Sequence, residues 1–112
     1  MSNKTPFDPV QAQLDAYNAG DVDAFVRCFA PTIVCEDGEG KRLFVGNATM
    51  RTRYAELFAA SPGLRCELGS RVRVGEYVID ELRVIGRDGE TVHAVAIYHV
   101  RGGVIAHIRF LR

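Results

Sequence analysis

The chain contains no tryptophan, and only three cysteines and four prolines occur among its 112 residues. Cys28, Cys35 and Cys66 form no Cys-x-x-Cys pair and do not lie at zinc-finger spacing from any histidine. This pattern favours reduced core thiols over a metal site or a disulfide framework. We therefore expect neither a metal nor a cofactor.

The chain also has no excess of charge of either sign, because 14 basic residues balance 14 acidic ones. That balance argues against a nucleic-acid or anionic membrane partner. No apolar run approaches the roughly 20 residues of a membrane span. The opening Met-Ser-Asn-Lys-Thr-Pro also lacks the apolar segment of a signal peptide. We expect a cytoplasmic protein.

The composition that remains is that of an ordinary globular domain, with 47% apolar and 25% charged residues. The length corresponds to one domain with one hydrophobic core. We expect a single domain over residues 1–112, in which residues 1–7 form a flexible N-terminal tail.

Helical periodicity marks the first part of the chain. Asp8 followed by Pro9 predicts a helix start, and Gly20 predicts its end. Asp21 caps a second predicted helix that ends at Pro31. The apolar residues at helical spacing are Val10, Leu14 and Tyr17 in the first helix, and Val22, Phe25, Val26 and Phe29 in the second.

Residues 32–37 alternate and are rich in β-branched side chains, which predicts a strand, and residues 42–45 predict a shorter one. Asn47 is the predicted cap of a third helix, which ends before Ser61. Its apolar stripe consists of Met50, Tyr54, Leu57 and Phe58.

From Leu64 onward the apolar residues recur with a period of two instead of the helical period. Four strands are predicted, over residues 64–74, 77–87, 91–101 and 104–111, with turns at Gly75-Glu76, Asp88-Gly89 and Gly102-Gly103. Helices followed by an antiparallel sheet indicate an α+β fold with the helices packed on one sheet face. Strands of this length predict a curled sheet, whose concave side would enclose a cone-shaped cavity.

The order of these elements, with Asn18-Ala19-Gly20-Asp21 between the first two helices and Glu36-Asp37 closing the first strand, resembles the NTF2-like superfamily. More narrowly it resembles the SnoaL-like and ketosteroid-isomerase-like branch, over about residues 8–112. The resemblance implies a cystatin-like cone with three N-terminal helices on a curled antiparallel sheet. Because that fold supports isomerases, cyclases, dehydratases and binding modules, it gives only an expectation of function.

Ketosteroid isomerases use an aspartate base with a tyrosine and a protonated aspartate as oxyanion donors. The resemblance places the base on Asp37, the tyrosine position on Gln13 and the second aspartate position on Tyr98. One of the three family residues is thus kept. Asp37 would transfer a proton beside a carbonyl of an apolar substrate. The alternative is a solvated acid that opens the Asp37-Gly38-Glu39-Gly40 turn.

Asp80 shares the face of its predicted strand with Val78 and Leu82, so alternation turns it inward. A desolvated carboxyl there could remain protonated and donate a hydrogen bond. The alternative is a bulge that turns Asp80 outward. An Asp-Arg-Asp arrangement of the epoxide-hydrolase kind is not expected, because no arginine has the inward parity on the strands.

Other polar candidates lie on the helices and the third long strand. Gln13, within the apolar stripe of the first helix, donates its amide either to a ligand or to the backbone. Tyr98 follows the small residues Ala94 and Ala96, so its hydroxyl would reach either a ligand or a neighbouring side chain. Tyr17 and Tyr54 are expected in the wall and core.

His93 and His99 take the opposite parity, and with His107 and Arg109 they are expected on the outer sheet face. In the superfamily that face commonly forms a dimer interface, so a homodimer is expected. Its apolar content would be Val95, Ile97, Ile105 and Leu111.

Two functions follow. The first is a cofactor-free enzyme, closest to a steroid delta-isomerase or a related lyase or cyclase, with Asp37, Tyr98 and Asp80 as catalytic residues. The second is a non-catalytic module for ligand binding or dimerisation. The few aromatic rings and the two alanines favour an open cavity. The predicted ligand pocket contains Gln13, Tyr17, Ile33, Cys35, Tyr54, Leu82, Ala96, Ile108 and Phe110, and Val78, Val84 and Ala94 share the inward face.

Overall fold

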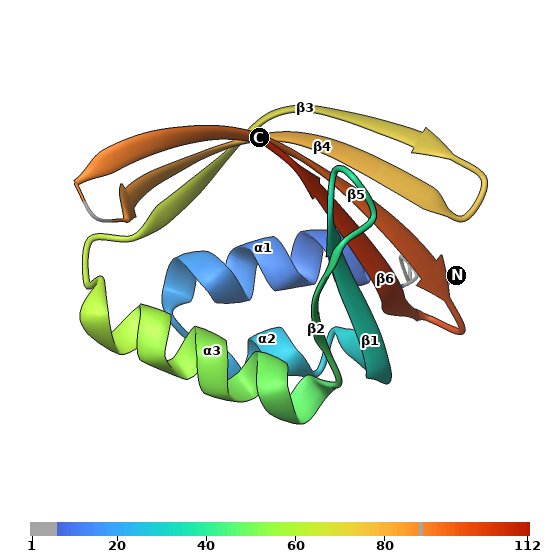
Figure 1. Cartoon of the computed structure of the whole chain (residues 1–112), viewed down its shortest axis with the longest axis horizontal. Coiled ribbons are helices and arrows are strands. Elements are labelled where there is room, and N and C mark those ends of the chain that lie inside the picture. The colour runs from blue at the N-terminus through green and yellow to red at the C-terminus, as the bar shows by residue number, and fades with distance from the viewer. Residues whose placement is uncertain (1–6, 88) are drawn as a thin grey trace, which may run out of the picture.

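A computed structural model describes residues 7–87 and 89–112. Three helices lie together beneath a curved sheet (Figure 1). In chain order the elements are α1 (Pro9–Ala19), α2 (Val22–Val26), β1 (Phe29–Asp37), β2 (Arg42–Val45), α3 (Asn47–Ala60), β3 (Arg65–Val74), β4 (Tyr77–Arg87), β5 (Glu90–Arg101) and β6 (Val104–Leu111). The α+β architecture predicted from the sequence is confirmed. Residues 1–6 of the predicted tail lie outside the described residues. None of the described helices is long and apolar enough to cross a membrane.

The six strands form one sheet in the order β2-β1-β6-β5-β4-β3. Neighbouring strands are antiparallel, except that β1 runs parallel to β6. The strands β2 and β3 are consecutive along the chain but lie at opposite sheet edges, so α3 connects one edge to the other. This crossing places the helix beneath the concave face (Figure 1).

The caps of the first two helices follow the sequence. The Asp8 carboxylate accepts hydrogen bonds from the backbone N–H groups of Val10 and Gln11, and Asp21 accepts one from Ala24. Gly20 ends α1 in the left-handed region, with φ of 67°.

Two predicted boundaries are wrong. The second helix ends at Val26, and Phe29 begins β1 opposite Ile105 of β6, because parallel pairing to β6 replaces the last predicted helical turn. The cap of α3 is Gly46 instead of Asn47, and no side chain bonds to that helix end.

Two bulges interrupt the alternation of the sheet. The register between β3 and β4 shifts at Gly69, and the register between β5 and β6 shifts at Ala106. The second bulge turns Ile105 into the core, where it is completely buried, so its predicted position on the outer face is wrong. The first bulge brings Arg71 to the inner face opposite Asp80, which corrects the expectation of no inward arginine.

The core lies between the concave face and the helices. Ile33, Met50, Ile105 and Ile108 are its largest fully buried apolar side chains. Aromatic rings extend it toward the helices, where the centroid of Phe25 lies 4.5 Å from that of Tyr54 and 4.9 Å from that of Phe29. These rings form part of the helix side of a cavity, which the core residues leave unfilled.

Candidate functional site

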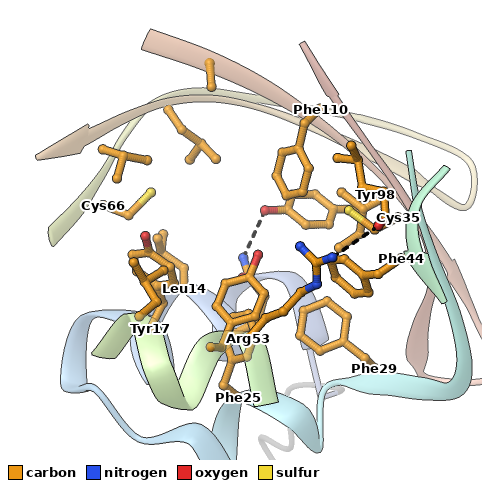
Figure 2. A pocket seen from close by; sticks show the side chains of 18 of the residues that line it. Leu14, Tyr17, Phe25, Phe29, Cys35, Phe44, Arg53, Cys66, Tyr98 and Phe110 are labelled. Carbon is orange, nitrogen blue, oxygen red and sulfur yellow. Dashed lines mark hydrogen bonds between the residues drawn. The ribbon is translucent and has the colours of Figure 1, made fainter. Parts of the chain in front are cut away.

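A cavity of about 440 Å³ lies between the concave sheet face and the helices (Figure 2). Its lining includes most of the residues expected there. From the helices come Gln13, Tyr17 and Tyr54, and from the sheet come Cys35, Leu82, Tyr98, Ile108 and Phe110. Val84 and Ala94 of the inward set also line it. The walls are otherwise mainly apolar, with Leu14, Phe25, Phe29 and Phe44 among them.

Several predicted site residues lie outside this lining. Ile33 and Ala96 are completely buried. They face the helices as predicted, but both pack in the core instead of the cavity wall, as does Val78. Asp37 and Asp80 are not among the lining residues either.

A buried polar contact in the cavity wall joins Gln13 to Tyr98. The Gln13 amide Nε2 donates to the Tyr98 hydroxyl at 3.2 Å and to the Val10 carbonyl at 3.0 Å. Burial, followed by the nearby charge of Asp80, raises the pKa of Tyr98 well above its ordinary value. The hydroxyl therefore stays protonated and retains its own hydrogen for an acceptor in the cavity.

Asp80 is completely buried, as alternation predicted, but it is an ion-pair partner of Arg71. The guanidinium donates Nε to Oδ1 at 2.7 Å and Nη2 to Oδ2 at 2.9 Å, and its Nη1 donates to Gln11 at 2.8 Å. Both Asp80 oxygens thus accept hydrogen bonds from a cation, so the structure does not place this carboxyl as a hydrogen-bond donor to a ligand. The Gly69 bulge supplies that cation, which strict alternation does not predict.

The Asp37 carboxylate holds the β1–β2 turn. Its Oδ1 accepts hydrogen bonds from the backbone N–H groups of Glu39 and Lys41, each at 2.9 Å. The residue is paired with Phe110 of β6, whose side chain does line the cavity. Asp37 thus lies beside the cavity wall while its carboxylate serves the turn, and its role as a base stays a prediction.

The three cysteines are buried and free. Cys35 and Cys66 line the cavity, and burial raises the pKa of Cys35 to about 12 and that of Cys66 to about 11. Such thiols are almost entirely protonated near neutral pH, which makes them poor nucleophiles.

Sequence reasoning missed four cationic side chains in the cavity lining: Lys41, Arg42, Arg53 and Arg112. The Arg53 guanidinium lies 5.2 Å from the centroid of the Phe44 ring, and its Nη2 donates to the Leu43 carbonyl at 3.5 Å. A signal was available, because Arg53 lies three residues after Met50 and four before Leu57, on the inward stripe of α3.

The histidines lie on the convex face, each against a glutamate. Their Nε2 atoms lie 2.7 Å from Glu81 for His93, 3.1 Å from Glu76 for His99 and 2.6 Å from Glu36 for His107. The described residues contain no cluster of three or more histidine, cysteine or acidic side chains suited to a metal ion.

Residues 10–108 match the family of SnoaL-like domains. No functionally curated protein matches the chain. A cystatin-fold protein from Novosphingobium aromaticivorans is 26% identical, with a TM-score of 0.87 over 97% of this chain and 100% of its own. A candidate polyketide cyclase from Sinorhizobium meliloti is 27% identical, with a TM-score of 0.78 over 92% and 93% of the two chains.

A protein with a ketosteroid-isomerase-like fold from Catenulispora acidiphila, in complex with trimethylamine, has a TM-score of 0.77. It is 20% identical, over 95% of this chain and 85% of its own. At that identity the likeness shows the fold alone. Together these similarities confirm the resemblance drawn from the order of elements and the Asn18-to-Asp21 segment.

Proposed function

Because the chain belongs to the SnoaL-like domain family, we propose that it binds an apolar small molecule in the cavity beneath its sheet. The single observation that carries the proposal is the cavity itself. Its volume of about 440 Å³ lies within the range of small-molecule sites, roughly 300 to 1,000 Å³. A mainly apolar wall with one buried polar pair is the usual composition of such a site.

The Gln13–Tyr98 pair fixes the orientation of the ligand. The Tyr98 hydroxyl already accepts from Gln13, so it has a hydrogen to donate to a carbonyl or hydroxyl oxygen of the ligand. A donor held in position within the cavity also suits an enolate-like oxygen. The pair therefore serves binding, and it would serve catalysis if a base were present.

Proton transfer of the isomerase or cyclase kind is the second candidate function, with Asp37 as the base. One observation favours it: Oδ1 holds the turn, but Oδ2 has no hydrogen bond within the described part of the chain. The candidate polyketide cyclase among the relatives gives a reaction class in which to search. Asp37→Asn keeps an acceptor for the turn, so it should abolish proton transfer and leave both ligand affinity and thermal midpoint nearly unchanged.

Isothermal titration with naphthol tests binding, using Ala94→Leu to narrow the cavity. The three added carbon atoms occupy space for ligand groups that contribute about 0.8 kcal/mol each, so affinity should fall roughly fiftyfold. Ala59→Leu makes the same change on the exposed surface of α3 and should leave affinity unchanged. Naphthol that failed to bind the wild type, or bound Ala94→Leu equally well, would contradict the proposal.

The convex face is the proposed surface of a homodimer. Val72 and Val74 lie on the side of β3 opposite Arg71 and are 53% and 59% exposed, and Leu111 is 38% exposed. Apolar side chains of this kind are buried when two such faces meet. Sedimentation equilibrium should give a dimer that Val74→Lys weakens, and a wild-type monomer would contradict this assembly.

A further inference from the structure

We propose that the ligand is an anion, a carboxylate on an apolar body, and that Arg53 binds its charged end. This inference rests on the proposed binding function and specifies the class of ligand. It starts from the charged side chains that line the cavity, which are all of one sign. Four of the lining residues are cationic, and no described lining residue is an aspartate or a glutamate.

The cations come from separate parts of the chain. Lys41 directly precedes β2 and Arg42 begins it, Arg53 lies on α3 and Arg112 follows β6. Across the described residues, none of the four forms an ion pair. The chain as a whole is neutral, so their convergence on one cavity is a local property of the fold.

Arg53 is the member of this group that reaches inward. Figure 2 shows its side chain extending from α3 toward Phe44 and Cys35 on the opposite wall. Its guanidinium lies over the Phe44 ring, and its one hydrogen bond to a described residue, the Leu43 carbonyl, is long at 3.5 Å. An arginine held by a ring and one weak bond retains most of its five N–H donors for a ligand.

The two acids at the end of β1 form no ion pair with these four cations among the described residues. Asp37 precedes Lys41 by four residues, but its Oδ1 accepts from two backbone N–H groups. Glu36 bonds to His107 and Arg109 on the convex face. A ligand carboxylate can therefore form a bidentate pair with Arg53, with its apolar body in the cavity.

Titration with a matched pair of ligands tests the charge directly. Naphthoate and its uncharged amide, naphthamide, have the same ring system and differ in charge. The wild type should bind naphthoate about tenfold more tightly than naphthamide, and the difference should shrink at high salt because part of the site is exposed. Equal affinity for the two compounds would overturn the proposal.

Arg53→Gln removes the proposed anchor, and Arg51→Gln is its control. Arg51 lies on the same helix and has the same charge, but it pairs with Asp23 and does not line the cavity. Arg53→Gln should weaken naphthoate about tenfold and change naphthamide less than twofold, while Arg51→Gln should change neither. Equal losses in the two variants would overturn the role of Arg53.

The experiments distinguish a failure of the binding function from a failure of the anion preference. If neither naphthoate nor naphthamide binds, the binding function itself is refuted. If naphthamide binds as tightly as naphthoate and Arg53→Gln binds both normally, the cavity binds small molecules but does not select anions.

Discussion

Two arginines lie between the concave sheet face and the helices, Arg71 of β3 in a closed half of this layer and Arg53 of α3 in an open half. Arg71 is held by Asp80 at two points and by Gln11 at a third, and its side chain is only 14% exposed. Among the described residues, Arg53 contacts the Phe44 ring, makes one long hydrogen bond and forms no ion pair. The same side chain therefore stabilises the fold in one half, and in the other half its charge remains available to a ligand.

The largest effect on stability is expected from a substitution that removes the ion pair of the closed half. Asp80→Ala leaves the largely buried Arg71 charge without its ion-pair partner and with only the neutral Gln11 amide as an acceptor, which costs about 3 kcal/mol or more in the free energy of unfolding. For a domain of this size the thermal midpoint should fall by about 10 °C or more. Glu81→Ala, on the exposed side of the same strand, should change the free energy by only about 0.5 kcal/mol. Similar losses in the two variants would remove the distinction between buried pair and surface acid.

Two alanines on the same face of β5 allow the closed and open halves to be compared by substitution. Ala96 is completely buried beside Asp80, whereas Ala94 lines the cavity. Ala96→Leu should destabilise by roughly 1 to 3 kcal/mol, because overpacking displaces neighbouring side chains. Ala94→Leu has free space and should cost less than about 1 kcal/mol. Urea unfolding of both variants measures the difference, and the opposite order would show that the cavity does not remain open in solution.

Tyr98 joins the two halves, since it bonds to Gln13 and its pKa is raised in part by Asp80. Tyr98→Phe removes the acceptor of a buried amide hydrogen bond and should cost about 1 kcal/mol of stability. It should also weaken naphthol binding. Tyr77→Phe, at an exposed ring stacked on His99, is the control and should change neither quantity.

The smallest effect concerns an acid on the convex face. Hydrogen bonds from His107, then from Arg109, lower the pKa of Glu36 below its ordinary value of 4.5. A lowered pKa contributes stability that is fully present above the unfolded-state value and is lost as pH falls through the folded-state value. The difference in thermal midpoint between wild type and Glu36→Gln should therefore be largest near neutrality and shrink below about pH 4.5. A difference that did not depend on pH would show that the charge of Glu36 is irrelevant.

The sequence predicts the two halves unequally. Alternation along β4 and β5 correctly turns Asp80, Leu82, Ala94 and Tyr98 inward, because no bulge interrupts those residues. It fails at Arg71 and Ile105, since the extra residues at Gly69 and Ala106 reverse the side-chain order beyond them.

The cationic part of the cavity lining was predicted least well. Neither helical periodicity nor a family template indicates that Lys41, Arg42, Arg53 and Arg112 converge, because they come from separate parts of the chain and meet only in the fold. The position of the Asp37 carboxylate is also set by the turn, because backbone N–H groups there compete with any substrate for its oxygen.

A crystal structure of the protein with naphthoate tests the contrast between the two arginines most directly. The account predicts the ring system between the helices and the sheet, the carboxylate within hydrogen-bond distance of the Arg53 guanidinium, and the Arg71–Asp80 pair unchanged. A naphthoate bound outside the cavity, or one whose carboxylate contacts Tyr98 while Arg53 points to solvent, would contradict it.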